Sequence, residues 1–127
     1  MKIYIASDHA GYEMKNHLID GLNNSNHQVE DCGAFTFDPL DDYPDFIIPT
    51  AEKVVSTINS RGIILGGSGQ GEAIAANRIK GIRAAVYYGG PKEIVKLSRL
   101  HNNANILSLG ARFISKEDII DIILLWL

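Results

Sequence analysis

The strongest constraint on the fold of this chain is a regular alternation of short, apolar, β-branched runs with longer amphipathic runs. Continuously apolar or alternating runs predict strands, and runs with apolar residues every three or four positions predict helices. Five strand–helix pairs follow one another along the sequence. The strands are expected at 2–7, 27–33, 61–67, 82–88 and 105–110, and the helices at 11–24, 47–59, 71–81, 91–102 and 115–127.

Repeated strand–helix pairs with nearly continuous apolar strands predict an α/β fold with a parallel sheet. Right-handed crossovers then favour a three-layer α/β/α sandwich with a doubly wound, five-stranded, Rossmann-like sheet. The length of 127 residues suits a single domain over 1–127. Gly81 is expected to end the third helix, and Ser115, with Asp118 three residues later, to begin the fifth. The irregular stretch 33–46, with four acids and two prolines, is expected to form a rim or lid.

Composition narrows the function classes. Hydrophobic residues make up 46% and charged residues 21%, as in globular proteins, and the net charge of −3 argues against a nucleic-acid or acidic-membrane partner. A single cysteine, Cys32, excludes an internal disulfide and a four-thiolate metal site. No signal-peptide pattern opens the sequence, and no apolar run approaches the ~20 residues of a membrane helix. We therefore expect a reducing, cytoplasmic location.

The segment "GGSGQGE", residues 66–72, joins a predicted strand to a predicted helix. Backbone N–H groups of such a turn can converge on an anion. The segment is neither a P-loop, since no Gly-Lys-Ser/Thr follows, nor the dinucleotide fingerprint, whose glycine spacing differs. The alternative is a tight turn in which Glu72 is favoured by the helix dipole. A capping box does not explain Glu72, because Gly71 stands three residues after Ser68. Spacing alone leaves both interpretations open.

Other candidates lie near strand ends. Asp8 and His9 end the first strand, where they could bind a sugar hydroxyl and move its proton, or where Asp8 could cap the next helix. Arg112, just past the fifth strand, is a plausible phosphate ligand or an ordinary surface arginine. His101 ends a helix at the opposite edge of the sheet. It can reach these residues only from a second subunit, which would imply a dimer. No His or carboxylate cluster has metal-ligand spacing, so metal-free chemistry is expected.

The motifs "DHAGYEMK", "DDYPDF", "GGSGQGEAIAANR", "GIRAAV" and "SRLHNNANILSLGAR", in this order, resemble the type B ribose-5-phosphate isomerases. These belong with the galactose-6-phosphate isomerases in one sugar-phosphate isomerase family. The resemblance covers essentially the whole chain. It implies cofactor-free interconversion of ribose 5-phosphate and ribulose 5-phosphate through ring opening and an enediolate, in the pentose phosphate pathway.

The resemblance also implies residue roles. One branch of the family uses a cysteine as base at the position of Gly66, whereas a second branch has a glutamate at the position of Glu72. Glu72 is then the base, His101 the acid for ring opening, and Ser68 the loop hydroxyl. The implied substrate-binding residues are Asp8, His9, Tyr43, Gly67, Gly69, Gln70, Gly71, Asn102 and Arg112. Family members usually continue with a basic C-terminal segment that completes phosphate binding. Either this sequence is a truncated one, or phosphate binding depends on Arg112, His9 and other residues nearby.

Two alternatives to a ribose-5-phosphate isomerase stay open at this point. A hexose 6-phosphate isomerase, acting on galactose or allose phosphates, has the same requirements in sequence. A non-catalytic module that holds a nucleotide in the glycine loop would need neither Glu72 nor His101. The leading expectation is a homodimer, or a higher homo-oligomer, with the active site shared between subunits, and with no cofactor, metal, nucleic acid or membrane partner.

Overall fold

The computed structural model describes all 127 residues and contains one five-stranded parallel sheet. Its strands are β1 (Lys2–Ser7), β2 (Gln28–Asp31), β3 (Ser60–Gly66), β4 (Ala84–Tyr87) and β5 (Ile106–Gly110). They lie in the order β2-β1-β3-β5-β4, and each neighbouring pair is parallel. β5 is buried along its whole length and β3 from Gly62 onward, as expected for central strands with apolar residues on both faces.

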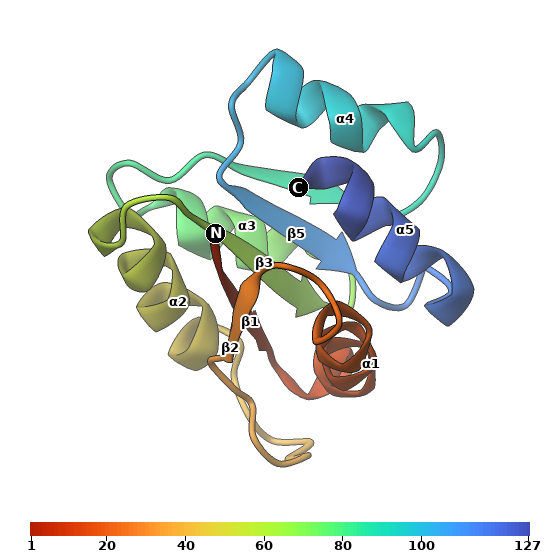
Figure 1. Cartoon of the computed structure of the whole chain (residues 1–127). Coiled ribbons are helices and arrows are strands. Elements are labelled where there is room, and N and C mark those ends of the chain that lie inside the picture. Colours follow the sequence, from red (N-terminus) through yellow and green to blue (C-terminus); the bar gives the residue numbers. More distant parts are fainter.

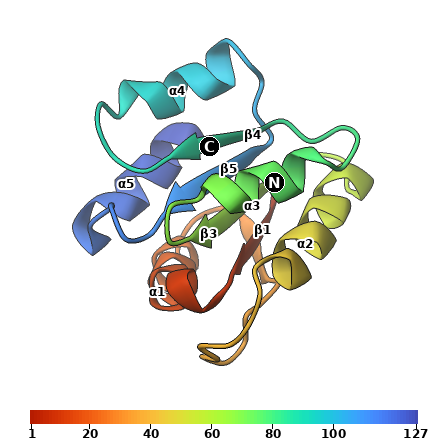
Figure 2. The same ribbon diagram turned by 180° about the vertical axis from the view of Figure 1, so that it is seen from behind.

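Helices cover both faces of the sheet, so the molecule has three layers (Figure 1). α1 (Tyr12–Leu22), α4 (Glu93–Leu100) and α5 (Lys116–Trp126) pack on one face. α2 (Pro44–Ser56) and α3 (Gln70–Asn77) pack side by side on the other, as the view from behind shows (Figure 2). The predicted three-layer, doubly wound α/β fold is confirmed. None of the helices is long and apolar enough to cross a membrane.

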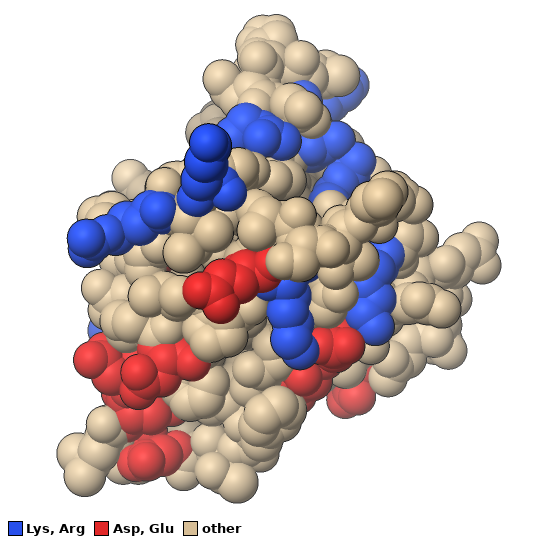
Figure 3. Space-filling model, turned by 90° about the vertical axis from the view of Figure 1, so that its left-hand side faces the viewer, with Lys and Arg blue, Asp and Glu red and all other residues tan.

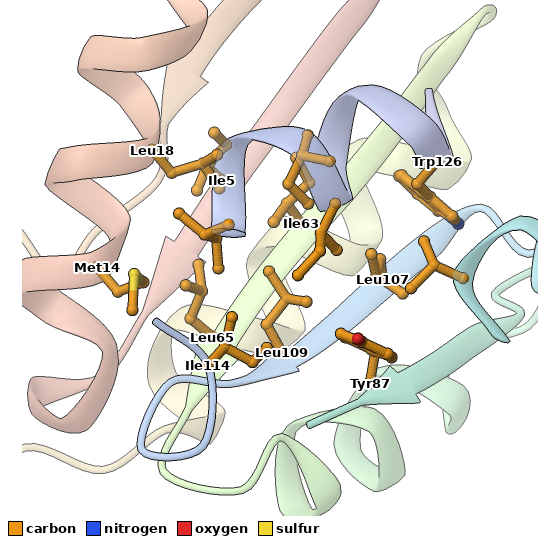
Figure 4. Packing of buried hydrophobic residues seen from close by; sticks show 14 of the residues in the cluster. Ile5, Met14, Leu18, Ile63, Leu65, Tyr87, Leu107, Leu109, Ile114 and Trp126 are labelled. Carbon is orange, nitrogen blue, oxygen red and sulfur yellow. The ribbon is translucent and has the colours of Figure 1, made fainter. Parts of the chain in front are cut away.

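Two hydrophobic clusters hold the layers together, one on each face of the sheet. The larger cluster joins Leu18 of α1 and Trp126 of α5 to the strand residues Ile5, Ile63 and Leu107 (Figure 4). Their side chains are at most 1% exposed, and burying each of them contributes about 1.5–3 kcal/mol. The smaller cluster seats α2 and α3 against the opposite face of the same strands. The sheet is therefore fixed from both sides, which makes its edges rigid supports for loops.

Helix α2 begins earlier in the sequence than the apolar pattern predicts. The pattern starts at Ile47, but the helix starts at Pro44 and ends at Ser56, so residues 44–46 are not part of an irregular rim. Proline suits a first helical position because its fixed φ is helical and its missing N–H is not needed there. The early start places Tyr43, the residue before Pro44, next to the glycine-rich turn after β3.

Helix α3 ends at Asn77, so the prediction that Gly81 ends it is wrong. The Asn77 side chain donates to the Ala84 carbonyl (3.1 Å) and accepts from the Ala84 N–H (2.8 Å), which ties the end of the helix to β4. Gly81 instead has φ +94° in the following turn, in the left-handed region that favours glycine. The predicted start of α5 is confirmed, since Ser115 Oγ accepts from the Asp118 N–H at 3.3 Å.

Candidate active site

The carboxyl ends of β1 and β3 form the centre of the candidate site. The two strands pair directly, with Ser7 opposite Leu65. The chain leaves β1 toward α1 on one face of the sheet and leaves β3 toward α3 on the other face. Connections that diverge from neighbouring parallel strands leave a crevice where ligands bind. Asp8 lies on one side of this crevice and residues 66–71, here called the glycine loop, on the other.

The glycine loop has free hydrogen-bond donors. The backbone N–H groups of Gly67, Ser68, Gly69 and Gly71 donate to no acceptor in the protein, whereas the Gln70 N–H donates to Ser68 Oγ at 3.3 Å. Gly69 has φ +79°, and a Cβ there would lie 2.9 Å from the Leu109 carbonyl carbon. Only glycine allows this turn, and the turn leaves N–H groups unpaired at the start of α3, where anions are favoured.

Glu72 is the third residue of α3, and its side chain is buried with only 5% of the residue exposed. Burial raises the pKa of its carboxyl above the ordinary 4.5, its own backbone N–H acts in the opposite direction, and the negative charge of Asp8 raises the pKa further. A Cβ on Gly66 would lie 1.7 Å from Glu72 Oε1. The carboxylate therefore lies over the end of β3, in space that only a glycine at position 66 leaves open. A carboxyl with a raised pKa in a crevice is suited to accept a proton near neutral pH.

His9 and Asp41 form an ion pair that the sequence did not reveal. Asp41 Oδ1 accepts from the His9 N–H at 3.0 Å and lies 2.7 Å from His9 Nδ1. The hydrogen bond to Asp41 is the largest cause that raises the pKa of His9. Burial acts in the opposite direction. The negative charges of Asp8 and Asp41 raise this pKa further, and the positive charge of Arg112 lowers it. The Asp41 side chain is only 9% exposed, and its Oδ2 is buried without a partner. The pair favours a positively charged His9 beside the crevice.

Arg112 and Tyr43 lie against the glycine loop from two sides. A Cβ on Gly67 would lie 3.1 Å from the Arg112 guanidinium carbon. The backbone N–H of Arg112 donates to the Gly67 carbonyl at 3.2 Å. A Cβ on Gly71 would lie 3.0 Å from the Tyr43 hydroxyl. The crevice thus combines a buried carboxyl, free N–H donors and a guanidinium. The sequence-predicted residues that come together here are Asp8, His9, Tyr43, Gly67, Ser68, Gly69, Gln70, Gly71, Glu72 and Arg112.

His101 and Asn102 do not lie in this crevice. They follow α4 at the amino edge of the sheet, where the nearby Asn105 carbonyl accepts from the N–H of Gly62 in the first half of β3. Both side chains are exposed. Within one copy of the chain His101 therefore lies away from Glu72, and its approach from a second copy stays a prediction.

One group of side chains has atoms close enough to share a cation. The ligand atoms of Asp8, His9 and Asp41 lie within 4.8 Å of one another. Their lone pairs are already partly used, because Asp8 Oδ1 accepts from the Ala10 N–H at 3.0 Å and Asp41 Oδ1 pairs with His9. A carboxylate that caps a turn and one that holds a histidine both have structural reasons to lie here. The expectation of metal-free chemistry therefore stays a prediction.

The geometry can be compared with known proteins. The family model described as Ribose/Galactose Isomerase matches residues 3–127. Ribose-5-phosphate isomerase B of Mycolicibacterium paratuberculosis is 48% identical over 112 residues, which cover 88% of this chain and 69% of that protein. Ribose-5-phosphate isomerase B of Clostridium thermocellum superposes with a TM-score of 0.93 at 43% identity, covering 99% of this chain and 83% of that one.

A second solved structure adds a ligand. Ribose-5-phosphate isomerase B of Mycoplasma genitalium, solved with bound ribulose-5-phosphate, superposes with a TM-score of 0.92 at 36% identity. The superposition covers 98% of this chain and 82% of that one. A family match over nearly the whole chain, with relatives this similar in sequence and fold, identifies the family. The chain belongs to the ribose/galactose isomerase family.

Proposed function

We propose that this protein is a cofactor-free aldose–ketose isomerase that interconverts D-ribose 5-phosphate and D-ribulose 5-phosphate. The observation that carries the proposal is the Glu72 carboxylate, which lies over Gly66 and beside free N–H groups at the carboxyl edge of the sheet. The names of its relatives, and the ribulose-5-phosphate bound in the Mycoplasma genitalium enzyme, support this substrate class. Residues 1–127 are proposed to act as one isomerase domain.

Isomerisation requires a base and an anion site in one place. In the open-chain aldose, Glu72 removes the proton from C2, and the electron pair moves toward the C1 carbonyl oxygen to give an enediolate. Returning the proton to C1, while the O2 proton is transferred to O1, completes the ketose. Free N–H groups of the glycine loop stabilise the negative oxygens, and such preorganised donors are each worth roughly 10²-fold or more in rate. The raised pKa of Glu72 brings its proton affinity closer to that of the substrate carbon acid.

The phosphate group is proposed to bind between Arg112 and His9. A guanidinium pairs with two phosphate oxygens at once, and the Asp41 hydrogen bond favours the cationic form of His9. The charge of Arg112 acts against the raised pKa of His9, so the two cations repel each other. An anion between them would relieve their repulsion. Asp8, Tyr43, Ser68 and Gln70 then line the space left for the sugar.

The active site is proposed to be shared between two subunits of a homodimer. His101 and Asn102 would come from the second copy, with His101 as the acid that opens the ring. A mostly apolar pocket of about 310 Å³ between α2 and α3 supports an interface next to the site, and it is lined by Tyr43, Pro44, Ile48, Ile74, Ala75, Arg78 and Ile79. Ile74 is 67% exposed in the isolated chain, although it lies only two residues from Glu72. A cytoplasmic location stays a prediction from the sequence.

The substrate is tested by comparing turnover of ribose 5-phosphate with that of galactose 6-phosphate and allose 6-phosphate. We expect kcat/KM to be highest for ribose 5-phosphate. Preferential turnover of either hexose phosphate would identify the protein as a hexose 6-phosphate isomerase of the same family. Absence of isomerisation with all three sugars, together with nucleotide binding by calorimetry, would favour a non-catalytic module.

A further inference from the structure

A second polar pocket lies at the amino edge of the sheet, away from the candidate active site. It has a volume of about 340 Å³ and lies among the turns that precede β3, β4 and β5. Its lining includes three arginines and several neutral polar residues, but no aspartate or glutamate: Arg61, Arg83, Arg99, Thr57, Asn59 and Ser60. Figure 3 looks onto this edge, where blue basic side chains form a band across the upper part and acidic side chains gather below. The pocket is positive although the whole chain has a net charge of −3.

Two of the three arginines, Arg83 and Arg99, are held in place without any acidic partner. Arg61 donates to the Trp126 carbonyl (3.3 Å) and to a main-chain oxygen of Leu127 (2.7 Å), the last residue of the sequence. Arg83 Nε donates to the Asn103 carbonyl at 2.8 Å, and Arg99 donates to Asn103 Oδ1 at 3.3 Å. None of the protein's salt bridges involves an arginine, and the Nη2 groups of these three make no hydrogen bond to the protein. Arg83 and Arg99 are thus oriented by neutral contacts, and all three guanidinium groups keep donors free.

Packing brings two of these charges close to one another. The guanidinium carbons of Arg61 and Arg99 lie 5.6 and 6.0 Å from the ring of Trp126. Burial lowers the pKa of Arg61, and the charge of Arg99 lowers it further. Like charges that are held together repel each other, and no aspartate or glutamate lines the pocket to offset the repulsion. An anion in the pocket would offset it.

We propose that this pocket, formed around Arg61, Arg83 and Arg99, binds the phosphate group of a small phosphorylated molecule, independently of the active-site crevice. Guanidinium groups bind phosphate oxygens bidentately, which suits donors that are already oriented. The volume is in the range of small-molecule sites, about 300–1,000 Å³. The side-chain amide of Asn59, which has no hydrogen-bond partner in the protein, provides a further polar contact.

The position of the pocket links it to the segment that carries His101. Arg83 and Arg99 both hold Asn103, which has φ +48° and lies two residues after His101. A phosphate that recruits these guanidinium groups competes with their contacts to Asn103. Binding is therefore expected to change the conformation of the segment 101–105. An effect on turnover through His101 rests on the proposed function, whereas binding itself does not.

Binding is tested by titrating the ¹⁵N-labelled protein with inorganic phosphate, adenosine monophosphate and ribose 5-phosphate at constant ionic strength adjusted with chloride. We expect saturable shifts of the Arg61, Arg83 and Arg99 side-chain signals and of residues 101–105. Arg83→Gln should weaken binding here about ten- to a hundredfold, and Arg83→Lys should weaken it less, because loss of a charged hydrogen bond has this size. Tighter binding of a phosphate ester than of inorganic phosphate identifies a phosphorylated metabolite; equal affinity identifies free phosphate as sufficient.

Two controls separate this site from the others. Lys96→Gln removes an exposed basic residue outside the pocket and should leave binding unchanged. Arg112→Gln should weaken ribose 5-phosphate binding at the crevice, and any shifts of His101 and Asn102 that this binding causes, but not the shifts of the Arg61, Arg83 and Arg99 side chains. The proposal is overturned if chloride gives the same shifts as phosphate, or if a folded Arg83→Gln protein binds phosphate as the wild type does. A failed isomerase assay would leave this result untouched.

Discussion

The carboxylate of Glu72 occupies the space that any side chain on Gly66 would need, since a Cβ at position 66 would lie 1.7 Å from Oε1 and 2.0 Å from Cδ of Glu72. The glycine at the end of β3 and the glutamate in the first turn of α3 therefore act as one unit. The conformation of Glu72 is defined by the strand beneath it as well as by its own helix.

Gly66→Ala is accordingly expected to lower kcat about a hundredfold or more, because the added methyl group displaces the proposed base. Substrate affinity should change less, since Arg112 and His9 are untouched. Steady-state kinetics with ribose 5-phosphate measures both effects. Gly21→Ala is the matched control, because the added Cβ there meets only the flexible end of Ile120, on the face of the sheet away from α3. Near-normal kcat in Gly66→Ala would show that the position of Glu72 over Gly66 is not needed.

Asp41→Asn is expected to lower the pKa of His9, because the Asp41 hydrogen bond is the main reason that this pKa lies above its ordinary value of 6.5. A raised histidine pKa means that the pair stabilises the folded state below about pH 6.5, and that this contribution is lost as the pH rises through the raised pKa. A lower pKa also leaves less of His9 positively charged at neutral pH. In the variant, the KM for ribose 5-phosphate should for this reason rise at neutral pH and recover toward acidic pH. NMR titration of the His9 ring measures the pKa directly. An unchanged His9 titration would contradict the assigned cause of the shift.

Arg112→Lys is expected to raise the KM for ribose 5-phosphate about tenfold, with a smaller effect on kcat. Lysine keeps the positive charge but cannot form the two parallel hydrogen bonds of a guanidinium with a phosphate. Ribose, which has no phosphate, is assayed in parallel, and its kcat/KM should be the same for the wild type and the variant. A KM that does not change would remove Arg112 from the phosphate site.

Mixing two inactive variants tests whether the active site is shared. If His101 serves the Glu72 of a second copy, a heterodimer of Glu72→Gln and His101→Ala chains has one site with both native residues. Random assembly of an equal mixture should then restore about a quarter of wild-type activity, as expected for a two-fold symmetric dimer. Each variant alone should stay inactive after the same unfolding and refolding treatment. No recovery in the mixture, despite confirmed heterodimers, would mean that both residues act within one subunit. Activity of the His101→Ala protein alone would mean that His101 is not required.

The sequence predicted the layers and most of the site because both depend on local patterns. Apolar strands such as β5 must lie inside a sheet, and the ends of parallel strands meet at one edge, which brings Asp8, Glu72 and Arg112 together. The contact of Asp41 with His9 spans 32 residues and depends on the path of an exposed segment. The four acids of the segment 33–46 indicated a functional rim. No periodicity in the sequence shows that Asp41, rather than another of these acids, contacts His9.

Three other features could not be predicted from the sequence for similar reasons. The early start of α2 depends on Pro44, which a pattern of apolar residues does not register. The early end of α3 depends on a side-chain pairing between Asn77 and β4, two elements whose contact is tertiary. The position of Glu72 over Gly66 also follows from three-dimensional packing rather than from the spacing of the two residues.

The most direct test of the proposed mechanism is deuterium exchange at C2 of ribose 5-phosphate in D₂O, followed by NMR for the wild type and Glu72→Gln. The account predicts rapid exchange with the wild type. It predicts exchange slower by about 10²-fold or more with Glu72→Gln, which should still bind the sugar phosphate. Exchange at a wild-type rate in the folded, substrate-binding variant would show that Glu72 is not the base.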